Sequence, residues 1–357
     1  MKKIIAILSV VLFSFGVAKA GELTVTGSAK ASYAVTSSDG TAASNDSAKG
    51  LGIENEFTLG ASGELDNGFT WSYAVDIDSV ESGATNDDAK LTLTTPMGTI
   101  GMFLGEGALG VDNAASQSVI ARPSDTSYDE LMTDTYDIDG YDNIQYHLPA
   151  DMLPFGITAK IGYAPSGLST AANDYQKTGT ANNRLATVDT ASAGGISLHP
   201  GGSSVSHYQV KAAPIDGLNI GADYVEFSGV LGSTEQAPES GAYFATYAYG
   251  PAVIGYSKTF LAAPMTAITA QVETVENDKI SIGINVNDNL SVSYEEEESQ
   301  PKLNTEGTTY TMTSTGIQAA YTMGGMTLGV AMNDHENAGY TENKDVKDTI
   351  FSVEMAF

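Results

Sequence analysis

The final ten residues, Asp348 to Phe357, alternate between two kinds of side chain. Phe351, Val353, Met355 and Phe357 share one parity, and the other parity is mostly polar. Because a β-strand points successive side chains to opposite faces, this pattern predicts a strand with one apolar face and one polar face.

The same alternation recurs along the chain, for example from Leu23 to Val35 and from Ile280 to Val286. Short and long connections alternate between these segments. Short ones such as Asp66-Asn67-Gly68 accept the positive φ angles of a tight hairpin. Such a pattern indicates an all-β fold, a transmembrane up-and-down antiparallel β-barrel. Sixteen strands are predicted, with the alternative of a different count if part of Ala262 to Asp278 forms a further strand.

The first twenty residues have the features of a cleaved signal peptide. Lys2 and Lys3 precede an apolar run from Ile4 to Val17, and Ala18-Lys19-Ala20 is a small-x-small cleavage site. The run is shorter than the ~20 residues that a spanning helix needs. We therefore predict a signal peptide over 1–20 and a single barrel domain over 21–357.

Cysteine content and charge restrict how the chain is stabilised and which molecules it binds. The chain has no cysteine, so no disulfide supports the predicted fold. Its 44 acidic residues outnumber 16 basic ones, three of which lie in the signal peptide. This charge disfavours nucleic acid as a partner and favours small cations.

With its predicted signal, the Tyr141 to Tyr146 run after a long third loop, and the terminal Phe357, the chain resembles the trimeric general-diffusion porins of Gram-negative bacteria. The resemblance implies a homotrimer in the outer membrane, with the third extracellular loop folded inward to narrow each barrel. It also implies a water-filled channel through which ions and small hydrophilic solutes diffuse passively. Phe357 would be the assembly signal, read by the barrel-assembly machinery in the presence of outer-membrane lipids.

The third loop, Glu106 to Asp139, matches the expected constriction in length and position. Eight acids and one base are its ionisable residues: Glu106, Asp112, Arg122, Asp125, Asp129, Glu130, Asp134, Asp137 and Asp139. The alternative is an external loop whose acids are simply solvated.

The pore wall is predicted from inward strand parity. Its charged residues are Lys30, Glu54, Glu56, Asp76, Asp78, Lys90, Lys160 and Lys211. None is an arginine, whereas the family pattern sets an arginine cluster against an acidic loop. We therefore expect a weaker transverse field and a preference for cations.

Other chemistry has little support. The four histidines, His147, His199, His207 and His335, are dispersed and show no metal-ligand spacing, and no nucleophile motif is recognisable, so an enzyme is not expected. The four acids Glu295 to Glu298 are interpreted as a solvated rim at a strand end. No cofactor is predicted, apart from weak calcium binding at acidic loops.

Two alternatives to passive diffusion stay open. One is a solute-specific channel with a saturable site, and the other is a surface all-β adhesin that does not conduct. Consistent apolar parity with aromatic residues near strand ends argues against the adhesin. The sequence does not separate the two kinds of channel.

Overall fold

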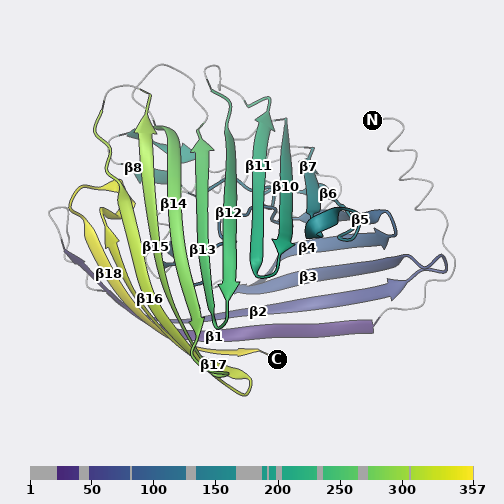
Figure 1. Ribbon diagram of the computed structural model, residues 1–357, viewed down its shortest axis with the longest axis horizontal. Coiled ribbons are helices and arrows are strands. Elements are labelled where there is room, and N and C mark those ends of the chain that lie inside the picture. The colour runs from purple at the N-terminus through teal and green to yellow at the C-terminus, as the bar shows by residue number, and fades with distance from the viewer. Residues whose placement is uncertain are drawn as a thin grey trace.

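The computed structural model shows a closed barrel of sixteen strands, each antiparallel to its neighbours (Figure 1). It describes residues 22–39, 48–80, 83–125, 134–165, 187–190, 193–197, 203–230, 236–263, 272–304 and 307–356. Neighbours in sequence are neighbours in the sheet, except that β7 pairs with β10. The predicted fold class and strand number are confirmed.

The barrel strands are long, and their bounds are as follows: β1 Glu22–Asp39, β2 Ala48–Glu64, β3 Thr70–Val80, β4 Gly83–Thr95, β5 Gly98–Leu104, β6 Asn143–His147, β7 Thr158–Ala164, β10 Ser204–Ile215, β11 Leu218–Ser228, β12 Glu239–Tyr249, β13 Ala252–Ala262, β14 Val272–Asn285, β15 Leu290–Leu303, β16 Met312–Met323, β17 Met326–Glu336 and β18 Asp345–Ala356. A separate hairpin pairs β8 (Thr187–Thr190) with β9 (Ala193–Ser197). Three short 3₁₀ turns complete the described elements: η1 Pro123–Asp125, η2 Pro154–Gly156 and η3 Ala338–Tyr340.

The last strand closes the ring against the first. In the β1–β18 ladder Ala29 lies opposite Met355 and Tyr33 lies opposite Phe351. Phe351 and Met355 point outward and are about half exposed, at 50% and 51%. The alternation that predicted this strand thus corresponds to one outward apolar face. Phe357 itself lies outside the described residues.

The tight turn predicted at Asp66-Asn67-Gly68 joins β2 to β3. The amide of Gly68 donates to the carbonyl of Leu65 at 2.8 Å, and the side chain of Asn67 accepts from the amide of Phe69 at 3.1 Å. Gly68 has φ of +79°, a conformation that costs glycine little. The local sequence therefore determines this hairpin.

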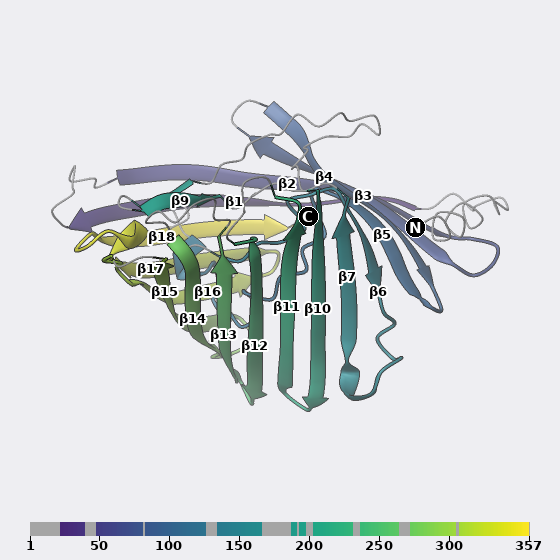
Figure 2. The ribbon, with the colours of Figure 1, turned by 90° about the horizontal axis from the view of Figure 1, so that it is seen from above.

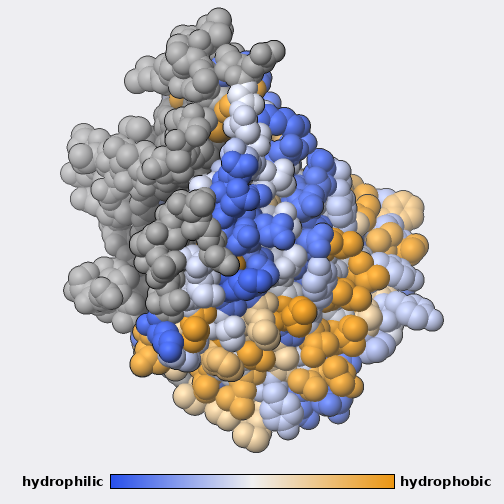
Figure 3. Space-filling view, turned by 90° about the vertical axis from the view of Figure 1, so that its left-hand side faces the viewer, coloured by the Kyte–Doolittle hydropathy of each residue, from blue (hydrophilic) through white to orange (hydrophobic). Residues whose placement is uncertain are grey.

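Large apolar side chains cover much of the outer surface. Strongly exposed examples on β1 and β2 are Leu23 at 72%, Leu51 at 86% and Ile53 at 72%. On the face drawn in Figure 3, hydrophobic residues gather over the lower part and hydrophilic ones lie above them. Among the described residues, no helix is long and apolar enough to cross a membrane.

Two polar stretches, Glu81 to Asp88 and Glu296 to Thr308, are among the long connections that the sequence predicts as loops, and both are partly strand. β4 already begins at Gly83, and β15 continues to Leu303. The uncertain stretch Ala262 to Asp278 adds no extra strand to the ring, because Val272 onward belongs to β14. Polar alternation at a barrel end resembles a loop in sequence, although the backbone continues to pair there.

Candidate pore constriction

The third loop lies inside the barrel against the inward faces of several strands. Its backbone forms hydrogen bonds of 2.8–3.1 Å with one inward side chain on each of four neighbouring strands: Ser257 of β13, Ser281 of β14, Ser293 of β15 and Gln318 of β16. These side chains satisfy backbone groups that would otherwise lack partners away from water. The loop is therefore hydrogen-bonded to the wall from Asp112 to Ile120.

Glycines on β13, β14, β16 and β17 let the loop approach closely. We call Gly255, Gly283, Gly316 and Gly329 the glycine seat, because a Cβ atom at each would meet a loop residue. The closest case is Gly255, where an added Cβ would lie 1.9 Å from the carbonyl oxygen of Ala115. Any larger residue at this point requires the loop backbone to move.

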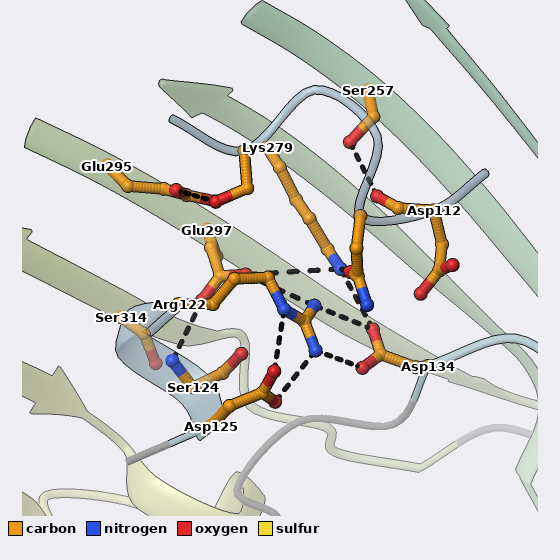
Figure 4. Close-up of polar contacts among 12 residues, drawn as sticks. Asp112, Arg122, Ser124, Asp125, Asp134, Ser257, Lys279, Glu295, Glu297 and Ser314 are labelled. Atoms are coloured by element: carbon orange, nitrogen blue, oxygen red, sulfur yellow. Dashed lines mark hydrogen bonds and ion pairs between the residues drawn. The ribbon is translucent and has the colours of Figure 1, made fainter. Parts of the chain in front are cut away.

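A buried ion cluster holds the middle of the loop (Figure 4). Arg122 is 7% exposed and donates to Asp125 at 2.7 and 2.8 Å and to Asp134 at 2.8 Å. Its Nη1 also lies 3.5 Å from Oε1 of Glu297, which is fully buried on β15. Lys279 of β14 adds a second cation, 2.9 Å from Asp134. Two cations and three carboxylates thus join the loop to the wall.

The protonation states of the loop partners follow from this cluster. Burial alone would raise the pKa of Asp134, but Lys279 and Arg122 outweigh it and hold that pKa well below its usual range. Burial opposes the charge of Arg122, but Asp134, Glu297 and Asp125 together raise the pKa of the guanidinium. The salt link of Arg122 to Asp134 is therefore ionic at neutral pH.

Glu295 and Glu297 are not a solvated rim, which corrects the prediction for Glu295 to Glu298. Both side chains point into the barrel and are at most 1% exposed. Oε2 of Glu295 accepts hydrogen bonds from three hydroxyls, those of Ser116 and Ser118 on the loop and Ser281 on β14. Oε2 of Glu297 accepts from the amide of Ser124 at 2.9 Å. Strand parity continues through the acidic run and turns every second carboxylate inward.

An apolar cluster holds the end of the loop. Tyr136, Ile138 and Tyr141 are at most 2% exposed and pack with residues of β7, β10, β11, β13 and β14. The ring of Phe227 on β11 meets Tyr136 edge-on at 5.1 Å and Tyr141 at 5.9 Å between centroids. Burial of these rings stabilises the inward position of the loop by the hydrophobic effect.

His207 of β10 joins this end of the loop to the wall electrostatically. Its Nδ1 lies 3.2 Å from Asp137 of the loop, and its Nε2 lies 3.1 Å from Asp223 of β11. Asp137 also accepts the amides of Leu109 and Gly110, at 3.0 and 2.7 Å. Although burial would raise the pKa of Asp137, His207 and these amides lower it.

The predicted wall residues lie mostly on β1 to β4. Lys30 of β1 forms an ion pair of 3.5 Å with Glu54 of β2, and Glu56 is exposed on the same strand. Lys90 of β4 pairs with Glu106 at the start of the loop. Asp76 of β3 is half-buried.

The remaining predicted residues are separate from that wall or are not described. Lys160 of β7 and Lys211 of β10 are half-buried on adjacent strands. Asp78 belongs to β3, but its side chain is not described, and Asp129 and Glu130 lie outside the described residues. The structure thus brings Arg122, Asp125 and Asp134 together and leaves Glu54 and Glu56 on another part of the wall.

Three acids approach one another at the start of the loop. Carboxylate oxygens of Asp76, Asp88 and Glu106 lie within 4.8 Å of one another. Lys90 of β4 forms an ion pair with Glu106 and so supplies a cation there. The group is a local concentration of negative charge with a protein cation beside it.

Sequence reasoning missed the wall partners of the loop. Lys279, Glu297, His207 and the glycine seat contact the loop, yet no prediction named them as pore residues. Inward parity was a usable signal for Glu297, because it alternates with the outward Tyr294 and Glu296. The sequence does not predict which loop residue each of these wall residues contacts.

Two loop carboxyls titrate near neutral pH. Burial, reinforced by Asp134, raises the pKa of Asp112 to about 6 against the opposing effect of Lys279 and Arg122. Burial and then Asp137 raise the pKa of Asp139 to about 6, with a smaller opposing effect from His207. Both pKa values exceed the ordinary value, so the seated loop binds these protons more tightly than a released loop does.

We therefore expect the loop to be held more firmly at pH 5 than at pH 8, because the stabilisation declines as the pH rises from the ordinary carboxyl pKa to about 6 and levels off above it. Single-channel recording at both pH values tests this through the frequency of brief current transitions, which should be lower at pH 5. Asp112→Asn with Asp139→Asn removes both titrating carboxyls and should reduce the difference. An unchanged pH response in the double variant would assign it to other groups.

Comparison with known proteins shows similarity in fold but not in sequence. The sequence matches no protein-family model and no curated protein. Its structure is similar to an anion-selective porin from Comamonas acidovorans, with 13% identity over 94% of this chain and 100% of that chain and a TM-score of 0.63.

Two further structures show the same likeness. A loop L8 deletion mutant of OmpT, an outer membrane protein of Vibrio cholerae, has 14% identity over 95% of this chain and 100% of that chain, with a TM-score of 0.64. OmpF of Salmonella typhi in complex with daunomycin has 12% identity over 94% of this chain and 98% of that chain, with a TM-score of 0.61. The chain therefore shares the porin barrel fold at very low sequence identity.

Proposed function

We propose that this protein is an outer-membrane porin of a Gram-negative bacterium, through which ions and small hydrophilic solutes diffuse passively. The observation that carries the proposal is a closed sixteen-strand ring with apolar side chains outside, polar ones inside and a loop anchored across part of the lumen. A charged side chain on a lipid-facing strand costs about 2–4 kcal/mol at the bilayer centre, which accounts for the apolar outer face.

The finer parts of the proposal rest on the same features. The predicted signal peptide over 1–20 directs export, and the mature chain assembles as a homotrimer. The largely solvent-exposed side chains of Leu51 and Ile53 on β2 provide an apolar surface for lipid or another subunit. No resident cofactor or enzymatic step is required for passive diffusion, and weak calcium binding at acidic loops remains a prediction.

Cation preference is proposed from charge. The fold does not determine its sign, because a similar barrel belongs to a porin described as anion-selective. In this chain acids greatly outnumber bases, and the single arginine of the third loop is neutralised by carboxylates. A pore lined by excess negative charge concentrates cations and repels anions.

Planar-bilayer recording of the purified protein is the direct test. We expect stepwise conductance in groups of three and a reversal potential in a salt gradient that reports cation preference. Conductance that rises in proportion to solute concentration supports passive diffusion, whereas saturation would identify the solute-specific alternative. Protein that inserts into liposomes without any conductance would contradict the proposal and favour a non-conducting surface protein.

A further inference from the structure

The third loop carries acids, but the structure neutralises the central ones at its contact with the wall. Asp125 and Asp134 are bound by Arg122, and Asp134 also by Lys279. Arg122 and Lys279 are 7% and 3% exposed, so their charges act mainly on these carboxylates and on Glu297. Opposite charges at such distances cancel each other in the field that reaches the lumen.

A different part of the wall carries the acids that remain in the lumen. In the ring of sixteen strands, β2, β3 and β4 lie eight places from β12, β13 and β14, and so on the opposite side of the barrel. Figure 2 shows β1 and β2 across the barrel from β11 to β13. The loop is hydrogen-bonded to β13 and β14, so the β2–β4 wall lies across the barrel from this attachment.

Negative charge exceeds positive charge on this wall. Four acids, Glu54, Glu56, Asp76 and Asp88, and Glu106 at the start of the loop face two lysines, Lys30 and Lys90. The five carboxylates and two ammonium groups leave three negative charges. Glu54 and Glu56 are exposed, and the side chain of Glu54 retains 75% of its accessible surface beside Lys30.

We propose that Glu54, Glu56 and Asp76 on the β2–β4 wall are the specificity-determining charges of the pore, while Asp125 and Asp134 position the loop. This inference rests on the proposed channel function and assigns its ion preference to particular residues. Low-dielectric walls focus the field of the wall carboxylates into the passage beside the loop. Cations are concentrated there, and added salt weakens the effect as the Debye length falls from about 10 Å at 0.1 M to about 3 Å at 1 M.

The test compares two variants that remove the same amount of charge. Glu54→Gln, Glu56→Gln and Asp76→Asn together remove three charges from the inward wall. Glu226→Gln, Glu296→Gln and Glu298→Gln remove three from outward positions, as shown by the hydrogen bonds of Glu226 and Glu296 to the exposed Tyr208 and Tyr294. Both variants keep the size and polarity of the side chains.

Reversal potentials in a potassium chloride gradient near 0.1 M should separate the two variants. The inward variant is expected to lose most of its cation preference, with a potassium-to-chloride permeability ratio close to one. The outward variant should keep the preference of the unmodified protein. Equal effects of the two variants, or no effect of the inward one, would overturn the assignment.

A third variant tests the loop without changing net charge. Arg122→Met with Asp125→Asn removes one cation and one carboxylate together from the buried cluster. We expect a changed gating pattern with the cation preference retained, whereas a loss as large as in the inward variant would make the loop the filter. Conducting channels with the wrong residue dependence contradict only this inference, whereas absence of conductance in the unmodified protein contradicts the proposed function.

Discussion

Replacing Gly255 by alanine is expected to force the third loop away from β13 and into the lumen, with lower single-channel conductance. The added Cβ would lie 1.9 Å from the carbonyl oxygen of Ala115, and this neighbour is backbone that cannot rotate away. Overpacking of this kind costs about 1–3 kcal/mol or more. Since the wall is continuous behind Gly255, the loop can yield mainly toward the pore axis.

Gly50 provides the matched control, because it is also on a barrel strand but a Cβ added there meets nothing within 4 Å. Gly50→Ala should leave single-channel conductance unchanged. Gly255→Val should reduce conductance more than Gly255→Ala, because its branched side chain adds further volume. If Gly255→Ala conducts as the unmodified protein does, the loop is not held against β13 in the membrane.

Replacing Arg122 by methionine should release the middle of the third loop. The change leaves Glu297 fully buried and Asp134 without their shared guanidinium, and Lys279 becomes the remaining cation of the described cluster. Removing one partner of a buried ion network costs about 3–5 kcal/mol. We expect frequent transitions between conductance levels and faster protease cleavage within the loop, both measured on the detergent-purified protein.

Two controls separate geometry from charge. Arg122→Lys keeps the positive charge but loses the planar fork that binds Asp125 through two nitrogens, so an intermediate effect is expected. Lys302→Met breaks an exposed ion pair with Glu276, which should contribute little. Arg122→Met behaving like Lys302→Met would show that the buried cluster does not anchor the loop.

The many contacts between the third loop and the barrel wall determine the shape of the pore. Serine and glutamine side chains on four neighbouring strands, together with the close approach allowed by Gly255 and Gly283, support the same short segment, from Asp112 to Ile120. Each contact is small, but together they leave the loop backbone few alternative positions. Conductance should therefore depend on wall residues far from the loop in sequence as strongly as on the loop itself.

Local sequence determined most of the barrel. Alternation of apolar and polar residues depends only on neighbours along a strand, so Phe351, Val353 and Met355 predicted one face of β18 correctly. Turn chemistry is equally local, as Gly68 shows with its positive φ. Strand ends were predicted less well, because the polar residues at the start of β4 and the end of β15 resemble a loop.

The tertiary structure alone decided what the acids of the third loop do. The sequence showed that eight acids accompany Arg122, but Glu297, which meets Arg122, lies 175 residues further along the chain. Lys279 meets Asp134 from a distance of 145 residues. Such contacts depend on ring closure, strand register and the path of the loop, which together place distant residues within hydrogen-bond distance. Residue types and strand parity could therefore predict an acidic lumen, whereas only the closed barrel determined which carboxylates form ion pairs with a buried cation.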